Sequence, residues 1–224
     1  MKIVDITGMI KNGMWNYGAP FPEFHLKKLP KIDWLSEEVF CEIFEGLHSQ
    51  TGTYFETPAH FLGNDKCYLA EDVPLEKLID IDCVILNLDR EFPEDQRTAI
   101  TAGDLKSRFS GRDIREGDAI IVGTGWGKKW MDDTYMKASP YFTYDAMMWL
   151  IAKKPCLLGS DFPRWENLED KQGFFPEFYH NDILMLAPCV NIEEIKEQRI
   201  KLTVAPVSIA GTSCVPCRAF VKEM

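Results

Sequence analysis

The sequence has few basic residues and lacks long apolar stretches. Its 224 residues include 25 Lys and Arg against 35 Asp and Glu, which gives a net charge of −10. This acidic balance argues against a surface for nucleic acid or for anionic membranes, because both attract basic patches. No apolar run approaches the roughly 20 residues that span a bilayer, and no secretory signal is visible. We therefore expect a cytoplasmic protein that binds neither nucleic acid nor membrane.

The sequence also lacks repeats, low-complexity tracts and Gly/Ser-rich linkers. A length of 224 residues fits one large domain or two small ones. The hydrophobic share of 46% is sufficient for a full core. Since nothing in the composition divides the chain, we expect a single domain over residues 1–224.

The cysteines do not indicate a disulfide framework. They are seven in number, and most lie inside apolar runs, as reduced and buried thiols do. Cys214 and Cys217 form a CxxC pattern near the end of the sequence. A lone CxxC is a weak zinc signal, and a redox pair would stand at a helix start after a strand. We predict two packed thiols.

Short apolar runs rich in β-branched residues predict strands. These runs are residues 83–88, 119–122, 156–158, 183–186 and 202–209. Thr101 begins a capping-box-like sequence, and Thr143 precedes a helical pattern that ends in two lysines. Residues 193–199 predict a short helix with acidic and basic ends that suit its dipole, whereas segment 37–47 fits either a helix or a strand. Strands that alternate with helices indicate an α/β fold.

Aromatic residues gather near the N-terminus among Gly and Pro. Trp15, Tyr17, Phe21 and Phe24 lie within ten positions of one another. Such a loop is compatible with a pocket wall, a core plug or an oligomer contact. From the first of these alternatives, we predict that Trp15 and Tyr17 contact a bound small molecule.

The segment HSQTGTYFETPAHF, residues 48–61, concentrates polar and titratable side chains between apolar neighbours. Its Thr-Gly-Thr bend predicts that Tyr54 and Glu56 lie on the same side, as alternate residues of a strand do. Pro58 argues against placing Glu56 and His60 on one helical face. Spacing alone leaves open a metal site, a metal-free acid–base site and an ordinary hydrogen-bonded turn.

Residues 50–60 read Gln-Thr-Gly-Thr-Tyr-Phe-Glu-Thr-Pro-Ala-His, and further motifs follow in order. They are VDITGMIKNGM before this segment, then ITAGDLKSRF, IREGDAIIVGTGWGKKW, SPYFTYDAMMWLIAKKPCLLGSDFP, HNDILM and VPCRAF after it. Together they resemble the cyclase-like metal-dependent hydrolases, a family that includes bacterial kynurenine formamidase and isatin hydrolase. The family signature reads His-Thr-Gly-Thr-His-x-Asp-x-Pro-x-His. The likeness covers nearly the whole chain.

The resemblance implies a fold and a reaction. The fold is a single α/β domain with a sheet-rich, barrel-like core flanked by helices. The resemblance also implies a homodimer or higher oligomer in which N-terminal segments help to close the sites. The implied reaction is metal-assisted hydrolysis of a formamide, lactam or similar amide, with arylformamidase (kynurenine formamidase) activity as the obvious label. The final motif histidine, His60, assists proton transfer.

The chain departs from the family in its metal ligands. Gln50 and Tyr54 replace the two leading histidines of the signature, and Glu56 replaces its aspartate. His180 matches the later metal histidine, and Glu193 is the best match to the later carboxylate, with Glu194 as the alternative. The resemblance thus implies one divalent ion (Zn, Mn or Mg) on Glu56, His180 and Glu193. This oxygen-rich set favours manganese or magnesium over zinc.

Three functions remain open on these residues. The first is a hydrolase that acts on a formamide, a lactam or related cyclic amide, or a lactone, through one ion or an altered metal site. Its catalytic residues are His60 and Glu56, with Gln50 at the substrate. The second is a metal-free dehydratase, isomerase or ring-opening enzyme that uses Tyr54, Glu56 and His60 as an acid–base trio. The third is a non-catalytic small-molecule-binding protein on the same fold.

Overall fold

The strands of the computed structural model follow the apolar runs of the sequence, and most of them join one large sheet. The structure describes the whole chain except residues 33, 38, 89, 110–113 and 224. Residue 38 belongs to segment 37–47, so that part of the expectation lies outside the described residues. The strands of the large sheet are β1 Lys2–Asp5, β4 Tyr54–Glu56, β5 Ile81–Asn87, β7 Ala119–Gly123, β9 Leu157–Ser160, β10 Leu184–Ala187, β11 Arg199–Pro206 and β12 Cys214–Glu223.

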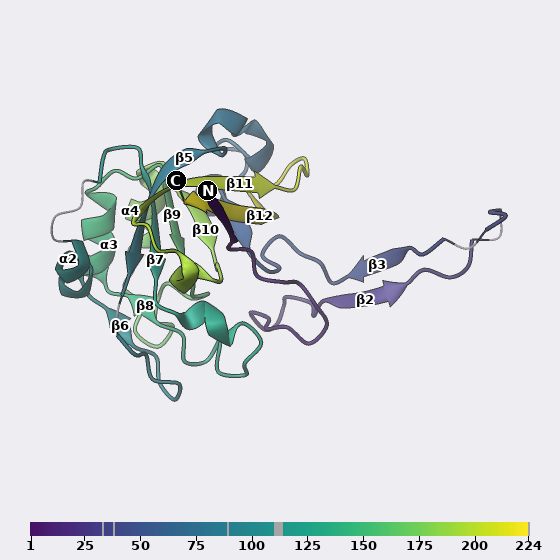
Figure 1. Cartoon of the computed structure of the whole chain (residues 1–224), viewed down its shortest axis with the longest axis horizontal. Helices are drawn as coiled ribbons and strands as arrows, with labels where there is room; N and C mark the ends of the chain where they lie inside the picture. Colours follow the sequence, from purple (N-terminus) through teal and green to yellow (C-terminus); the bar gives the residue numbers. More distant parts are fainter. Residues whose placement is uncertain (33, 38, 89, 110–113, 224) are drawn as a thin grey trace.

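This sheet closes on itself into a barrel (Figure 1). Among the described strands the order is β12–β11–β5–β7–β9–β10–β4, and β4 pairs with β12 to complete the ring, while β1 lies along β12. From β5 through β7 and β9 to β10 the strands are parallel, and antiparallel pairs join the rest. Buried parallel strands explain the continuous apolar runs of the sequence. The expected sheet-rich, barrel-like α/β core is confirmed.

Helices and short loops pack against the outer face of the parallel strands. The predicted starts are confirmed at Thr101 and Thr143, and the Thr143 hydroxyl accepts a hydrogen bond from the backbone N–H of Ala146 at 3.4 Å. The α-helices are α1 Ala59–Leu62, α2 Ala102–Phe109, α3 Tyr144–Ile151 and α4 Phe175–His180. The 3-10 helices are η1 Ala70–Asp72, η2 Leu75–Lys77, η3 Trp126–Lys129 and η4 Ile192–Glu194, and β6 Ala99–Ile100 pairs with β8 Tyr141–Phe142.

The predicted helix over residues 193–199 is wrong. A single 3-10 turn ends at Glu194, and β11 begins at Arg199. Ile200 is fully buried beside Cys83 of β5, and the Arg199 guanidinium donates to both carboxylate oxygens of Asp118 at 2.7 and 2.9 Å. These strand and side-chain contacts outweigh the weak helical preference of a charged segment.

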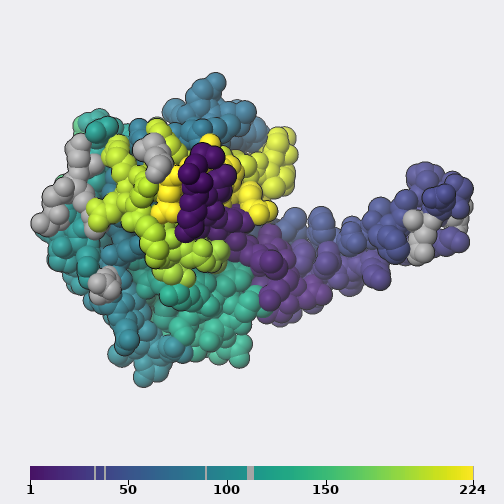
Figure 2. All heavy atoms as spheres, in the orientation of Figure 1, coloured from purple at the N-terminus to yellow at the C-terminus, as the bar shows by residue number. Residues whose placement is uncertain are grey.

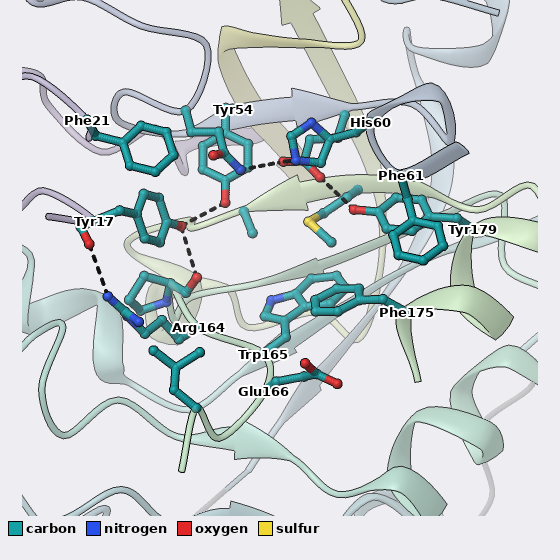
Figure 3. A pocket seen from close by; sticks show the side chains of 16 residues that line it. Tyr17, Phe21, Tyr54, His60, Phe61, Arg164, Trp165, Glu166, Phe175 and Tyr179 are labelled. Carbon is teal, nitrogen blue, oxygen red and sulfur yellow. Dashed lines mark hydrogen bonds and ion pairs between the residues drawn. The ribbon is translucent and has the colours of Figure 1, made fainter. Parts of the chain in front are cut away.

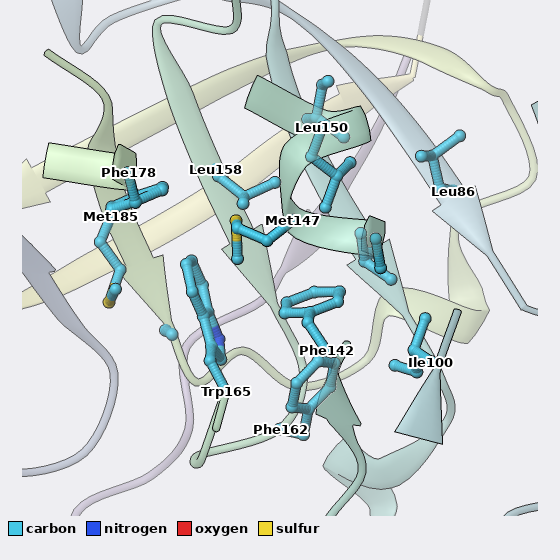
Figure 4. Packing of buried hydrophobic residues seen from close by; sticks show 14 of the residues in the cluster. Leu86, Ile100, Phe142, Met147, Leu150, Leu158, Phe162, Trp165, Phe178 and Met185 are labelled. Atoms are coloured by element: carbon cyan, nitrogen blue, oxygen red, sulfur yellow. The ribbon is translucent and has the colours of Figure 1, made fainter. Parts of the chain in front are cut away.

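Alternation along the barrel strands separates two buried clusters, one inside the barrel and one under the helices. Phe55 belongs to the inner cluster, and Leu86 belongs to the outer one. Figure 4 shows the outer cluster, where Met147 of α3 packs against the strands. Cys214 lies in the outer cluster and Cys217 in the inner cluster, both as free thiols. The predicted packed thiols are therefore confirmed, on opposite faces of β12.

A long hairpin projects from this body. It contains β2 (His25–Lys28) and β3 (Glu42–Glu45), so segment 37–47 includes a strand. Every residue of the two strands is exposed. Figures 1 and 2 show the hairpin extending away from the barrel along the long axis of the molecule. Within the described residues, no helix has the length and apolar character of a membrane span.

Candidate active site

A cavity of about 370 Å³ lies on the outer face of β4 and β10. Helices α1 and α4, the N-terminal loop around Tyr17 and the loop over residues 163–168 complete its wall. Most lining side chains are aromatic or apolar, as is usual for a small-molecule site. His60 lies at one side of the cavity, and Arg164 and Glu166 lie at the other (Figure 3). Of the predicted substrate contacts, Tyr17 and Gln50 line the cavity.

Trp15 is not a lining residue of this cavity, which corrects its predicted substrate contact. Its ring packs edge-on against the ring of Tyr17, with 5.4 Å between centroids, and against Trp130 at 5.2 Å. Trp15 therefore supports the wall from behind. The sequence showed only the cluster of aromatics, and the fold decides which of them face the cavity.

Glu56 is the buried carboxylate of the cavity. It is 1% exposed and lies on β4 between Cys214 of β12 and Met185 of β10. The Gln50 amide donates to its Oε1 at 2.8 Å, and the Tyr179 hydroxyl donates to its Oε2 at 2.7 Å. Neutral donors thus satisfy the buried carboxylate oxygens, as burial of a charge requires.

His60 stands beside Glu56 at the open side of the cavity. Glu56 ends β4, whereas His60 lies in the first turn of α1, which begins after Pro58. The two residues therefore do not share a helix, as Pro58 predicted. His60 Nε2 lies 3.6 Å from Glu56 Oε1, and the imidazole is 37% exposed. This separation exceeds a direct hydrogen bond and leaves space for a bridging atom.

Cys214 completes a group of possible metal ligands that the sequence did not reveal. Its Sγ lies 3.6 Å from Glu56 Oε1 and 3.4 Å from the backbone oxygen of Ser49. Burial and the neighbouring Glu56 carboxylate raise the pKa of the thiol well above its usual value. Ligand atoms of Glu56, His60 and Cys214 all lie within 4.8 Å of one another. Cys214 could be found only from its pairing with Glu56 across β12 and β4.

The expected ligand set of Glu56, His180 and Glu193 is not assembled, and this is a correction. His180 is exposed at the end of α4, and its Nδ1 lies 2.6 Å from the backbone oxygen of Pro176. Glu193 lies in η4, 3.8 Å from the amine of Lys128. Neither residue lines the cavity. The match to the family motifs assigned these residues, but it does not show the direction in which each element of this chain presents its side chains.

Tyr54 lies in the wall of the same cavity as Glu56 and His60, on the side of β4 that was predicted. Its hydroxyl is 2.7 Å from that of Tyr17, and Tyr17 donates to the backbone oxygen of Pro163 at 3.0 Å. Tyr54 therefore donates to Tyr17. Burial and the nearby Tyr17 and Glu56 raise the pKa of Tyr54 well above its usual value, so it is a neutral phenol.

Stacked aromatic rings form the side of the cavity next to Glu56. The rings of Phe61 and Tyr179 are nearly parallel, 8° apart with centroids separated by 5.6 Å, and Phe175 stacks on Tyr179 at 5.9 Å. Figure 3 shows Phe61 and Tyr179 near His60, and Phe175 closer to Trp165. Flat apolar walls of this kind suit a planar ring. The sequence predicted no role for Phe61, Phe175 or Tyr179, which become neighbours only when α1 and α4 pack together.

Comparisons with known proteins agree with this architecture. A family model described as "Putative cyclase" matches residues 4–167. An isatin hydrolase bound to the product analogue thioisatinate is similar with a TM-score of 0.82 at 20% identity, covering 98% of this chain and 91% of that one. Isatin hydrolase A from Ralstonia solanacearum is similar with a TM-score of 0.81 at 18% identity, over 98% and 91% of the chains.

A further similar structure is a predicted metal-dependent hydrolase from Bacillus stearothermophilus. Its TM-score is 0.76 at 20% identity, and the match covers 98% of this chain and 97% of that one. A search of curated protein sequences finds no match. At these identities the solved structures establish the shared fold, and the site must be interpreted from its own residues.

Proposed function

Since the chain belongs to the cyclase family, we propose that it hydrolyses an amide-type C–N bond of a small aromatic molecule. The substrate class is a formamide, a lactam or related cyclic amide, with a lactone as the oxygen counterpart. The observation that carries this proposal is the convergence of Glu56, His60 and Cys214 at one side of an aromatic cavity. In the reaction water adds to the carbonyl carbon, the C–N bond breaks and the nitrogen takes a proton.

A single divalent ion fits the donor set of this site. The separations of 3.6 Å from Glu56 Oε1 to His60 Nε2 and to Cys214 Sγ match those between ligands of one tetrahedral ion with bonds of about 2.0–2.3 Å. Three protein ligands leave one position open, which is the usual arrangement of a catalytic zinc. Thiolate and imidazole ligands favour zinc over the manganese or magnesium expected from the sequence.

Bound there, such an ion would polarise the substrate carbonyl and lower the pKa of the attacking water. The chain's own residues prepare the site. Gln50 and Tyr179 orient the Glu56 carboxylate through their hydrogen bonds, as outer partners of metal ligands do. Phe61 and Phe175 flank Tyr179 and exclude water from the side that receives the aromatic ring.

One observation supports a metal-free reaction as the second candidate. Both oxygens of Glu56 already accept hydrogen bonds, and the raised pKa of Cys214 keeps its thiol protonated. Without an ion the imidazole of His60 is free, and a water molecule between His60 and Glu56 can exchange protons with both. Tyr54 then lines the cavity as a neutral phenol and transfers no proton, because its hydroxyl already donates its hydrogen to Tyr17.

The proposed reaction is tested with formanilides, aromatic lactams and aromatic lactones, assayed with added zinc or manganese and again with a chelator. We expect turnover of one amide class that the chelator abolishes. Glu56→Gln preserves the shape of the side chain and is expected to lower kcat/KM by at least about a hundredfold. Turnover that persists with the chelator supports the metal-free alternative. Binding without turnover in any class contradicts hydrolysis.

The partner we propose besides the substrate is a second copy of this chain. The support is the hairpin, whose side chains Trp34, Phe40 and Phe44 are 82%, 73% and 60% exposed. Large apolar groups gathered on a projecting arm mark an interaction surface. The hairpin joins the N-terminal loop that carries Tyr17 and Phe21, so an arm docked on a second copy would steady one wall of the cavity.

A further inference from the structure

Arg164 is a fixed cation in the wall of the aromatic cavity. It lies in the loop that follows β9 and lines the cavity together with Tyr17 and Trp165. In Figure 3 its guanidinium lies beside Tyr17, across the cavity from His60. Among the described lining residues, the other basic side chain is the imidazole of His60. A cation here is notable because the chain as a whole carries a charge of −10.

The backbone around Arg164 is held by another arginine. Arg97 donates to the backbone oxygen of Arg164 at 2.7 Å and to that of Glu166 at 2.5 Å. It also donates to the backbone oxygens of Ser139 and Pro140. These bonds fix the course of the loop without using the Arg164 side chain. The guanidinium of Arg164 is therefore presented on a braced backbone.

That guanidinium has unused donors. Its Nη2 donates a long hydrogen bond of 3.3 Å to the backbone oxygen of Tyr17, and its Cζ lies 5.8 Å from the centre of the Tyr17 ring. Its Nε is buried and has no hydrogen-bond partner in the part of the chain that the structure describes. No ion pair joins Arg164 to a carboxylate of the described residues. A buried donor left unpaired is costly, so the Nε points to a missing acceptor.

We propose that Arg164 binds the carboxylate of an anionic aromatic ligand and makes such acids the preferred substrates of the cavity. The planar guanidinium matches a carboxylate in a two-pronged arrangement. The ring of the ligand lies along the aromatic wall, and its hydrolysable amide lies toward Glu56 and His60 at the other side. This inference rests on the proposed function for the reaction, whereas the recognition of the anion stands on Arg164 alone.

The test measures binding and requires no turnover. The probes are 2-naphthoate and 2-naphthamide, which share their ring and shape and differ in charge. Isothermal titration of the wild-type chain is expected to show naphthoate bound about tenfold to a hundredfold more tightly. Arg164→Met is expected to remove this preference, and Arg164→Lys to weaken it several-fold, since lysine keeps the charge but not the planar fork.

Lys137→Met is the matched control. Lys137 borders a second, open cavity that Arg164 also touches, but it does not line the aromatic cavity. The control is expected to keep the full preference for naphthoate. Loss of the preference in Lys137→Met would show that the anion binds in the second cavity, which contradicts the inference. Equal affinity of wild type for both probes, or a preference that survives in Arg164→Met, overturns the inference.

The outcome separates this inference from the proposed hydrolysis. If the preference for naphthoate depends on Arg164 but no amide is turned over, the inference stands and the hydrolase proposal fails. If neutral and anionic amides are turned over at equal rates and binding shows no preference, the hydrolase proposal stands and the inference fails. If Arg164→Met does not fold, as judged by its thermal melt, the Arg164→Lys titration decides the result.

Discussion

At the scale of single residues, the site depends on how a buried carboxylate is satisfied. Glu56 lies in an aromatic cavity and receives its hydrogen bonds from an amide and a phenol, while the imidazole of His60 stands 3.6 Å away. Neutral donors hold the carboxylate in place, so its position suits a metal ligand or a partner of the His60 imidazole.

Removing one of these donors is expected to destabilise the fold. In Tyr179→Phe the stacked ring remains, but Glu56 loses the 2.7 Å hydrogen bond at its Oε2. A hydrogen bond to a buried charged group contributes about 1.5–3 kcal/mol, so urea unfolding should show a loss of that size.

Tyr68→Phe is the control for this substitution. Tyr68 is half-buried, and it donates an exposed hydrogen bond of 2.6 Å to Asp182. Its removal is expected to change the free energy of unfolding by at most about 0.5 kcal/mol. Equal losses in the two variants would contradict the special cost of leaving Glu56 without its donor.

At the scale of secondary-structure elements, strand type and alternation could be predicted from the sequence, but the pairing of strands could not. The same-side placement of Tyr54 and Glu56 follows from the period of a strand. The approach of Cys214 to Glu56 depends on the register of β12 against β4, which no local pattern encodes. His180 was misplaced for the same reason, because the packing of α4 decides which of its faces meets the cavity.

Two glycines, one between barrel strands and one in a helix, are expected to respond in opposite ways to substitution by alanine. An added Cβ at Gly159 of β9 would lie 2.9 Å from the backbone oxygen of Leu186 and 3.2 Å from Ile121 Cγ1. The strands must separate, so Gly159→Ala is expected to cost about 1–3 kcal/mol of unfolding free energy.

Gly103→Ala is the counterpart in α2, where the nearest atom to an added Cβ is the Thr101 hydroxyl at 3.5 Å. Alanine restricts the unfolded chain and favours the helix, so this variant should gain about 0.5–1 kcal/mol. Thermal or urea unfolding measures both effects. A stabilised Gly159→Ala chain would show that the strands of the barrel are less closely packed than described.

The hairpin of β2 and β3 predicts the state of association. Trp34→Glu and Phe44→Glu place charges on its exposed apolar surface and are expected to convert a dimer into a monomer in sedimentation experiments. Leu75→Glu is the control, since Leu75 is 63% exposed on η2 away from the hairpin. A monomeric wild-type chain, or a dimer that withstands both hairpin substitutions, would contradict the proposed partner.

At the scale of the whole molecule, the barrel brings together residues that are far apart in the chain. Tyr17, Glu56, Arg164, Tyr179 and Cys214 lie on five separate segments and meet at one cavity or its base. The family resemblance correctly predicted the barrel, and its assignment of the site to residues 50–60 stays a prediction. It could not predict Cys214 as a candidate ligand, because a cysteine on a late strand has no place in the family signature.

The metal content of the purified chain, prepared without chelator or affinity metal and then incubated with zinc, tests the proposed site most directly. We expect about one ion per chain, lost in Glu56→Ala and Cys214→Ser. The ion should be retained in Cys217→Ser, whose thiol lies inside the barrel, and in His180→Ala and Glu193→Ala. A wild-type chain without metal, or a Cys214→Ser chain that keeps its ion, would contradict the assignment of Glu56, His60 and Cys214 as the ligands.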